Sequence, residues 1–372
     1  MPQVDANPTT PAVAPGGAPP PAQPEPAALF LPPGPQDIRI DRQEGNLPPP
    51  AMMADPDGAM PLAWVMEDED GDDALPEPRP SAIMIGRAGV HFVLSRLLSW
   101  GVHAYAADPG LPYDIIVEVG REVSPIRLQV MSTAQPPRGR CYRFALTRGF
   151  HGSAHGVFPY QPGDFDVAAF VPLGLDRVLF RPFGEATFAA TPAEFCAPQA
   201  EQQSWRLALA AALFLPPGPG DIRFDGQDRE AEGPRDIMIG EAGVHFVLSR
   251  LLSRGIRAQA AGAGLPYDAI AHVGGEVGPI RLQVKTTARP PRGRRYRFAL
   301  KRGFHGSARG VFAYRAGDFH VAAFVPLGLD RVLFRPFGEA TFAATPAEFR
   351  APLAEQQSWR LALAALRARQ PA

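Results

Sequence analysis

Lysine is nearly absent from this sequence of 372 residues, in which 37 side chains are Lys or Arg. Only Lys285 and Lys301 are lysines. Lys285 lies in the segment "IRLQVKTT" at 280–287, and 154 positions earlier a near copy, "IRLQVMST", carries Met131 in its place. Arginine never deprotonates, whereas lysine is a compact charge with a movable pKa. A lysine kept in a chain that otherwise uses arginine therefore indicates chemistry that a guanidinium group cannot perform.

The alternation of side chains along a strand predicts which residues would work with Lys285. Successive residues of a strand point to opposite faces, so Gln283 and Lys285 share one face of the strand expected at 279–287. The glycines of "VGGEVG" indicate a hairpin with the strand expected at 267–273. That hairpin would bring Asp268 opposite the end of its second strand. A carboxylate, an amide and an ammonium group would then lie close together.

An amphipathic helix is expected ahead of these strands. The segment "GEAGVHFVLSRLLSRG" has apolar residues at helical spacing and a stop at Gly255. Glu241 lies three positions before Val244 and seven before Leu248, so we expect it at the head of the buried stripe. A buried carboxylate needs a partner or a metal ion. Glu241 is therefore a fourth candidate residue for the site.

Taken in order, the helix that begins with Gly-Glu, the motif "PYD" and the strand ending in "QVKT" resemble the PD-(D/E)xK nuclease superfamily, the restriction-endonuclease-like fold, and especially its bacterial Gln-x-Lys members. The resemblance spans about residues 236–300. It implies that Asp268, Gln283 and the backbone carbonyl of Val284 bind a metal ion. It also implies that Lys285 orients or deprotonates the attacking water, and that Glu241 completes the site.

The same resemblance implies Mg²⁺ as the cofactor, with Mn²⁺ as an alternative. Hard cations of this kind take oxygen ligands and substrate phosphates, polarise the phosphate and lower the pKa of a bound water. Gln283 departs from the Asp or Glu that is more frequent at its position. This departure removes one negative charge, so it weakens the expected hold on the metal.

The earlier copy of the motif, at about 82–146, is degraded. Asp114 and Gln129 keep the carboxylate and the amide, but Met131 replaces the lysine and Arg87 replaces the helix glutamate. Methionine has neither a proton nor a charge to offer, so we expect this copy to be catalytically inactive. Drift in both copies, with Lys285 simply unchanged so far, is the alternative interpretation.

Positive charge is concentrated behind the second motif. Residues 220–372 carry 23 basic and 14 acidic side chains, whereas residues 1–219 carry 14 and 24, so the net charge of −1 conceals two oppositely charged halves. The segment "RPPRGRRYRFALKR" interleaves aromatic and basic residues, as expected of a surface that binds nucleic-acid phosphates; a solvated loop is the other interpretation. The expected DNA-binding residues are Arg289, Arg292, Arg294, Arg295, Arg297, Lys301 and Arg302.

Internal repetition predicts the domain organisation. Residues 167–195 recur unchanged at 321–349, which indicates one domain written twice. We expect a disordered Pro/Ala-rich tail at 1–27, a degenerate domain at 28–210 with an acidic insertion at about 44–80, and a domain with the intact motif at 211–372. The predicted fold class is α/β, with two tandem restriction-endonuclease-like domains, each a mixed central sheet flanked by helices.

Several function classes are disfavoured. The sequence starts without a basic and apolar leader, and its longest apolar run, at 207–215, is about half of a membrane span, so we expect a cytoplasmic protein without a membrane partner. Two cysteines cannot build a zinc site. Among the histidines, we expect His91 and His245 to be packed in helices, His151 and His305 to lie in turns, and His320 to have no partner.

The leading hypothesis is a Mg²⁺-dependent endonuclease that hydrolyses DNA phosphodiester bonds through the second copy. One active site per chain would nick DNA; cutting both strands would require a homodimer, while the two copies could also pair within one chain. The alternative is an inactive nucleic-acid-binding or regulatory protein that retains the fold. A third idea is autoinhibition, in which "EDEDGDD" covers the arginines as a phosphate mimic.

Overall fold

The computed structural model describes residues 79–120, 124–149, 156–213, 232–274, 278–303, 310–338 and 340–369. All of them belong to one compact unit, Asp68–Ala372. The predicted tail and nearly all of the predicted acidic insertion lie outside the described residues, as do His151 and His305. The described parts of 79–213 are called copy 1 below, and those of 232–369 copy 2.

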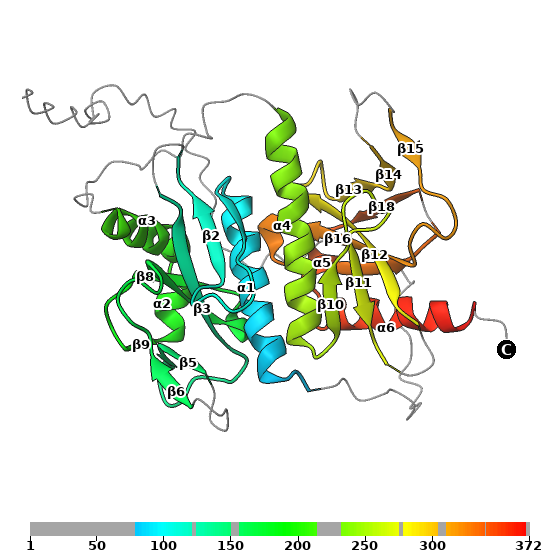
Figure 1. Cartoon of the computed structure of the whole chain (residues 1–372). Coiled ribbons are helices and arrows are strands. Elements are labelled where there is room, and N and C mark those ends of the chain that lie inside the picture. Colours follow the sequence, from blue (N-terminus) through cyan, green and yellow to red (C-terminus); the bar gives the residue numbers. More distant parts are fainter. Residues whose placement is uncertain are drawn as a thin grey trace, which may run out of the picture. The chain divides into compact units, whose positions relative to one another are not determined.

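Copy 1 and copy 2 contain equivalent elements in the same order (Figure 1). Copy 1 consists of α1 (Ala82–Ser99), β1 (His103–Ala106), β2 (Ile115–Glu118), β3 (Ile126–Thr133), β4 (Tyr142–Ala145), β5 (Thr147–Gly149), β6 (Val157–Pro159), β7 (Val167–Pro172), β8 (Leu179–Pro182), β9 (Thr187–Ala190), α2 (Pro192–Cys196) and α3 (Ala200–Ala212). Copy 2 consists of α4 (Glu232–Ser253), β10 (Arg257–Ala260), β11 (Ala269–His272), β12 (Ile280–Thr287), β13 (Tyr296–Ala299), β14 (Lys301–Arg302), β15 (Phe312–Ala313), β16 (Val321–Pro326), β17 (Leu333–Pro336), β18 (Thr341–Ala344), α5 (Pro346–Arg350) and α6 (Ala354–Arg367).

Each copy is built on a mixed five-stranded sheet, which confirms the predicted α/β class. The order is β1-β2-β3-β7-β8 in copy 1 and β10-β11-β12-β16-β17 in copy 2. In copy 2, β12 pairs with β16 in parallel, and the other neighbours are antiparallel. The expected hairpin is therefore present between β11 and β12. Strands β14 and β15 lie in the described part of the Gly-rich stretch at 301–317.

The two faces of the copy 2 sheet pack against different partners. On one face, Leu282 and Val284 of β12 join a core with α4 and α6, to which Leu248 and Trp359 contribute. On the other face, Phe324 of β16 joins an aromatic cluster with residues of β13, β18 and α5. The period-two pattern of β12 is thus satisfied on both sides. Gln283 and Lys285 point to the aromatic side, because they alternate with Leu282 and Val284.

Helix α4 forms as expected, but its contact with the sheet is centred on a glycine. Val247, Leu248 and residues one turn further on are buried, as the stripe predicts. A Cβ atom on Gly243 would overlap the hydroxyl of Thr286 on β12, so the Thr286 side chain packs directly against the backbone of the helix. Because this side of α4 packs closely on the sheet, the polar face of the helix makes its contacts elsewhere.

Contacts join the two copies through α1 and α4, which run side by side (Figure 1). The ring nitrogens Nδ1 of His91 and His245 are 2.8 Å apart, and the rings stack. The expected packing of both histidines in helices is thus confirmed, and each is the other's partner. Helix α1 also has the length and composition of a membrane span, but its buried residues form the core of copy 1.

Two reciprocal ion pairs also join the copies. Nη1 of Arg96 in copy 1 donates to Oδ1 of Asp330 in copy 2 (2.5 Å). Nη2 of Arg250 in copy 2 donates to Oδ2 of Asp176 in copy 1 (2.7 Å). Each arginine also donates to the backbone carbonyl of the aspartate in its own copy. The contact therefore uses the same residue types from both sides, as an isologous dimer interface does.

Candidate active site of copy 2

Asp268, Gln283 and Val284 meet at the junction of β11 and β12. The carboxylate oxygen Oδ2 of Asp268 accepts hydrogen bonds from the backbone N–H of Val284 (2.8 Å) and from Nε2 of Gln283 (2.5 Å). Nε2 of Gln283 also donates to the carbonyl oxygen of Val284 (3.2 Å). Asp268 itself donates its backbone N–H to Leu282 (2.8 Å), which fixes the register of the hairpin end. The structure thus brings together the three residues predicted to hold a metal.

The amide nitrogen of Gln283 lies where two acceptor oxygens converge. A carboxylate and a backbone carbonyl face the same point, which is the polarity expected around a cation. In this structure an N–H donor fills that role. A half-turn of the terminal amide would put Oε1 in place of Nε2, so that three oxygens would lie close together. The described residues include no cluster of three or more His, Cys, Asp or Glu side chains that could hold a metal.

Lys285 is held beside this cluster by two neighbours that the sequence did not reveal. Its ammonium donates to the carbonyl oxygen of Lys301 (2.8 Å) and to the hydroxyl of Tyr314 (3.3 Å), and it lies 5.2 Å from the centre of the Tyr314 ring. Tyr314 has a counterpart in Tyr160 of copy 1, so the internal repeat was its only signal. Both neighbours come from the segment of β14 and β15, far from β12 in sequence.

Burial shifts the pKa values of both charged groups in the site. Burial raises the pKa of Asp268, against the hydrogen bond from Val284 and the charge of Lys285. Burial also lowers the pKa of Lys285, against the opposing effect of Asp268. Each group is therefore less stable in its charged form than it would be in water. Such paired shifts are typical of functional sites, although structural networks produce them too.

Glu241 does not join this site, and its predicted burial is wrong. The side chain is exposed on α4. It lies two positions before Gly243, which faces the sheet, and two helical residues turn the chain by about 200°. Helix α4 also covers the sheet face opposite to Gln283 and Lys285. Apolar periodicity does not predict this orientation of the helix, because Gly243, at the point of closest approach, has no side chain that would count as apolar.

Copy 1 keeps the carboxylate and the amide of the site without the ammonium group. Oδ2 of Asp114 accepts the backbone N–H of Val130 (2.8 Å), and Nε2 of Gln129 donates to the carbonyl of Val130 (3.4 Å). Met131 packs against the aromatic cluster of copy 1. Arg87 is exposed on α1, in the same position as Glu241 on α4, so it does not lie beside Asp114 as a competing cation.

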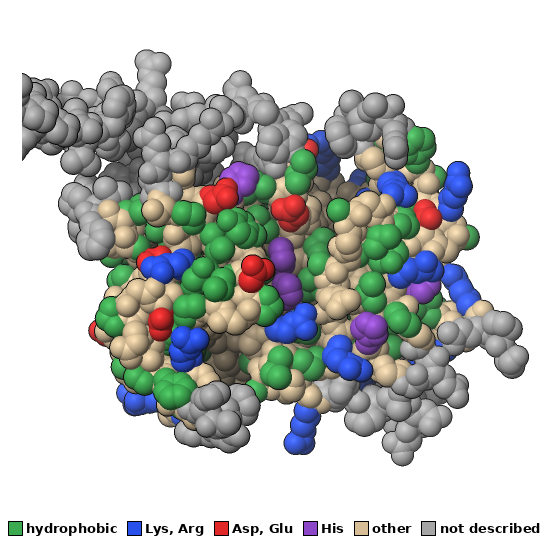
Figure 2. Space-filling view, in the orientation of Figure 1, with side chains coloured by type: hydrophobic (Ala, Val, Ile, Leu, Met, Phe, Trp, Pro, Cys, Tyr) green, Lys and Arg blue, Asp and Glu red, His purple; other side chains and the backbone are tan. Residues whose placement is uncertain are grey.

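The predicted DNA-binding side chains are all exposed in copy 2. Arg292 and Arg295 bridge a tight turn before β13, and Arg297 alternates on that strand with buried aromatic residues. The carbonyl of Lys301 accepts from Lys285, so one of these basic residues adjoins the site directly. On the face shown in Figure 2, Lys and Arg side chains lie over the elements of copy 2. The exposed set is Arg289, Arg292, Arg294, Arg295, Arg297, Lys301 and Arg302.

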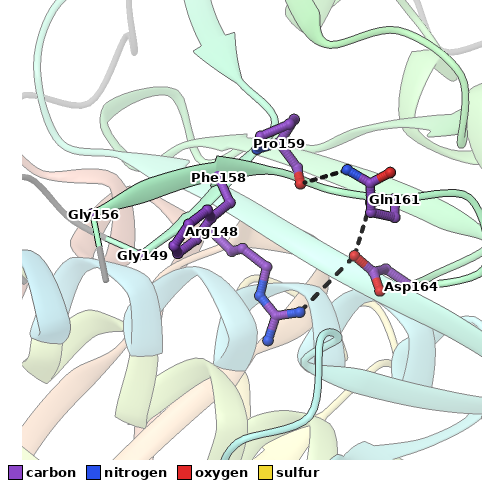
Figure 3. Close-up of a pocket in the computed structure, with 7 residues that line it drawn as sticks. All are labelled: Arg148, Gly149, Gly156, Phe158, Pro159, Gln161 and Asp164. Atoms are coloured by element: carbon purple, nitrogen blue, oxygen red, sulfur yellow. Dashed lines mark hydrogen bonds and ion pairs between the residues drawn. The ribbon is translucent and has the colours of Figure 1, made fainter. Parts of the chain in front are cut away.

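A pocket of about 710 Å³ lies on the β5–β6 hairpin of copy 1 (Figure 3). Arg148 faces Asp164 at 4.0 Å, and Asp164 also accepts the backbone N–H of Gln161 (2.9 Å). The one basic and one acidic side chain in its wall thus face each other. This hairpin corresponds to β14 and β15, which hold Lys285 in copy 2. None of the predicted site residues lines this pocket.

No protein-family model and no curated protein matches this chain. A solved structure of a bacterial homing endonuclease, I-Ssp6803I, is similar over 37% of this chain and 98% of its own, with 21% sequence identity and a TM-score of 0.29. It is a weak structural neighbour that is itself an endonuclease. A similarity at this level carries no weight for the activity of this chain, which must be argued from its own residues.

Proposed function

We propose that copy 2 is a metal-dependent endonuclease that hydrolyses phosphodiester bonds in DNA. The observation that supports this proposal most directly is the convergence of the Asp268 carboxylate and the Val284 carbonyl on one point, beside the half-buried ammonium of Lys285. The exposed arginines before and along β13 provide positive charge for the phosphates of a substrate. Copy 1 would contribute binding surface without catalysis.

The donor set fits a hard divalent cation that is completed by substrate and water. Asp268, the carbonyl of Val284 and, with its amide reversed, Gln283 would hold Mg²⁺, or Mn²⁺ in its place. Magnesium is commonly held by one or two carboxylates together with substrate phosphates. When bound, the ion would act as a Lewis acid on the phosphoryl oxygen and lower the pKa of a water.

The residues of the chain have separable roles in this proposal. Lys285 would donate hydrogen bonds to the attacking water or to a phosphate oxygen, in exchange for those it makes to Lys301 and Tyr314. Its lowered pKa favours proton transfer nearer to neutral pH than for a solvated lysine. Tyr314 would keep the ammonium on the side of the sheet that carries Gln283.

Lys285→Met tests the proposal with a residue that the chain already accepts at this position. Met131 occupies the equivalent place in copy 1 within a well-packed core, so the variant should fold. With supercoiled plasmid and Mg²⁺ or Mn²⁺, we expect the wild type to form nicked circles and the variant to be slower by about 10²- to 10⁴-fold. Arg257→Gln, at an exposed side chain of β10, serves as the control. Equal nicking by the wild type and Lys285→Met would refute the assignment.

A second candidate function is non-catalytic DNA binding or regulation. The observation in its favour is that the Gln283 amide already satisfies both Asp268 and Val284 with N–H groups, as a cation would. This hypothesis predicts that the wild type binds DNA with strong salt dependence but neither cuts it nor takes up Mg²⁺ or Mn²⁺ in calorimetry. It also predicts that Lys285→Met leaves the DNA affinity unchanged.

A further inference from the structure

A charge difference between the copies lies next to the candidate site, at the start of β3 and β12. In copy 1, Asp166 accepts three hydrogen bonds from Arg127. Its Oδ2 accepts from the backbone N–H (2.8 Å) and from Nε (3.0 Å), and its Oδ1 accepts from Nη2 (2.8 Å). The aspartate neutralises the arginine. In copy 2, the equivalents are Arg281 and His320. The expectation that His320 has no partner is therefore wrong, and its partner is a cation.

The contacts between Arg281 and His320 cannot all be hydrogen bonds. The backbone N–H of Arg281 points at Nδ1 of His320 (3.2 Å), and Nη2 of the guanidinium group lies 2.8 Å from Nε2. Both groups of the arginine are donors, and a guanidinium never accepts. A neutral imidazole accepts at one nitrogen and donates at the other. In either tautomer, one N–H group of His320 therefore faces an N–H group of Arg281.

The tautomer of His320 decides at which of the two contacts the N–H groups oppose each other. If Nδ1 accepts from the backbone, then Nε2 carries the proton and confronts the guanidinium. Burial lowers the pKa of His320, and the charge of Arg281 lowers it further, so the ring is neutral rather than doubly protonated near pH 7. Two donors that point at one another gain stability when an anionic oxygen lies within reach of both.

A pocket of about 330 Å³ lies beside this pair. His320 and Arg369 are in its wall, with Gly317 and Phe337. Arg369 uses one of its N–H groups on the carbonyl of Phe337 (3.0 Å). The pocket is therefore lined by the neutral imidazole of His320, which contacts Arg281, and by the guanidinium group of Arg369, and no acidic side chain lines it.

We propose that Arg281, His320 and Arg369 form an oxyanion-binding site of copy 2. An oxygen of a phosphate group would accept from Nη2 of Arg281 and from Nε2 of His320, and would supply the negative charge that Asp166 supplies to Arg127 in copy 1. The ligand is a free phosphate or the backbone phosphate of a nucleic acid, which share this chemistry. The proposal goes beyond the nuclease assignment, since it holds whether or not Asp268 and Lys285 support hydrolysis.

The position of the site relates it to the catalytic candidates. Arg281 and Gln283 lie on the same face of β12, two residues apart, which corresponds to about 6.6 Å along a strand. A nucleic acid bound at Gln283 would therefore have a neighbouring phosphate near Arg281. Copy 1 has no equivalent charge to offer, because Asp166 neutralises Arg127.

Inorganic phosphate and the variant His320→Asp test the proposal on the full chain. The variant recreates the Arg127–Asp166 pair, so the fold tolerates it, and melting curves would check this. In histidine-labelled protein, the ring ¹⁵N signals of His320, assigned by their loss in the variant, should shift saturably with phosphate. Calorimetry should show phosphate affinity falling about tenfold or more in His320→Asp, equivalent to about 1.4 kcal/mol.

Two controls identify the source of the bound phosphate and show whether the proposed site fails. Potassium chloride at matched ionic strength should leave the His320 signals unchanged. A short single-stranded oligonucleotide, which phosphate displaces, would identify a backbone phosphate as the ligand; a response to phosphate alone would identify a free one. Shifts that chloride reproduces, or phosphate binding that is equal in His320→Asp, would overturn the site. Plasmid nicking is measured separately, so a failed nuclease assignment would not imitate either result.

Discussion

Lys285 occupies a position where a charge is costly, and copy 1 shows what the fold adopts without it. The ammonium lies among Tyr314 and a backbone carbonyl, and burial lowers its pKa. Met131 fills the same place against the aromatic cluster of copy 1. The folded state binds fewer protons than the unfolded chain between the lowered pKa and 10.5, so stability rises with pH in that window. At neutral pH the charged lysine therefore opposes folding.

Lys285→Met should therefore make the protein more stable. We expect the free energy of unfolding at pH 7 to rise by about 1 kcal/mol, the usual scale for relief of a strained functional residue. Urea unfolding of the two proteins measures the difference. Lys301→Met, at an exposed side chain, should leave the value unchanged. A loss of stability in Lys285→Met would instead mean that the lysine is kept for structure.

At the scale of elements, α4 packs on β12 through a glycine that leaves room for a side chain of the strand. Gly243 contacts Thr286, the residue next to Lys285, so the distance between the helix and the strand that carries the site depends on this glycine. Gly240, one turn earlier on the same helix, has open space at its Cβ position. Two glycines of one helix thus have opposite roles.

The two glycines give a matched pair of substitutions. Gly243→Ala should destabilise the protein by about 1 to 3 kcal/mol, because the added methyl group must push α4 away from β12. Gly240→Ala should stabilise it by about 0.5 to 1 kcal/mol, since alanine is the better helix former. Thermal or urea unfolding would measure both. Similar effects of the two substitutions would show that the close contact is unimportant.

The basic residues at 289–302, called the basic turn below, should act on DNA through charge. Copy 1 carries Gln135 and Thr147 where copy 2 has Arg289 and Lys301. The double variant Arg289→Gln, Lys301→Thr should reduce the slope of log affinity against log salt by about 2, because each lost phosphate contact contributes about 0.9. Fluorescence anisotropy at several salt concentrations gives the slope. Arg257→Gln, on β10, is the control, and an equal effect of this control would mean that the basic turn has no special role.

At the scale of the whole molecule, the α1–α4 contact concentrates buried polar groups between the copies. Burial alone would raise the pKa of Asp330, but its hydrogen bond from Arg96 and the charges of three arginines hold it below the ordinary value. Burial lowers the pKa of His91 to about 3 and that of His245 to about 4. The folded protein therefore keeps both rings neutral in a range where the unfolded chain would protonate them.

The histidine pair predicts acid sensitivity. With folded pKa values below the unfolded 6.5, the unfolded chain binds more protons, so stability is complete above pH 6.5 and is lost as the pH falls towards 4. The loss should approach about 1.4 kcal/mol per pH unit for each ring. Urea unfolding from pH 7 to 4 measures it. In His91→Gln, His245→Gln the curve should be flatter, whereas an unchanged slope would place the sensitivity elsewhere.

The sequence by itself determined the features that are local in the chain or repeated in both copies. Alternation along β12 placed Gln283 and Lys285 on one face, the hairpin brought Asp268 to them, and the repeat predicted two sheets of one kind. The tertiary structure decided what depends on distant segments: Tyr314 and the Lys301 carbonyl around Lys285, Arg281 opposite His320, and α1 against α4. It also turned Glu241 outward, because close packing at Gly243 sets the phase of α4. Periodicity records which side chains are apolar, whereas the phase and partners of an element depend on shapes brought together only by folding.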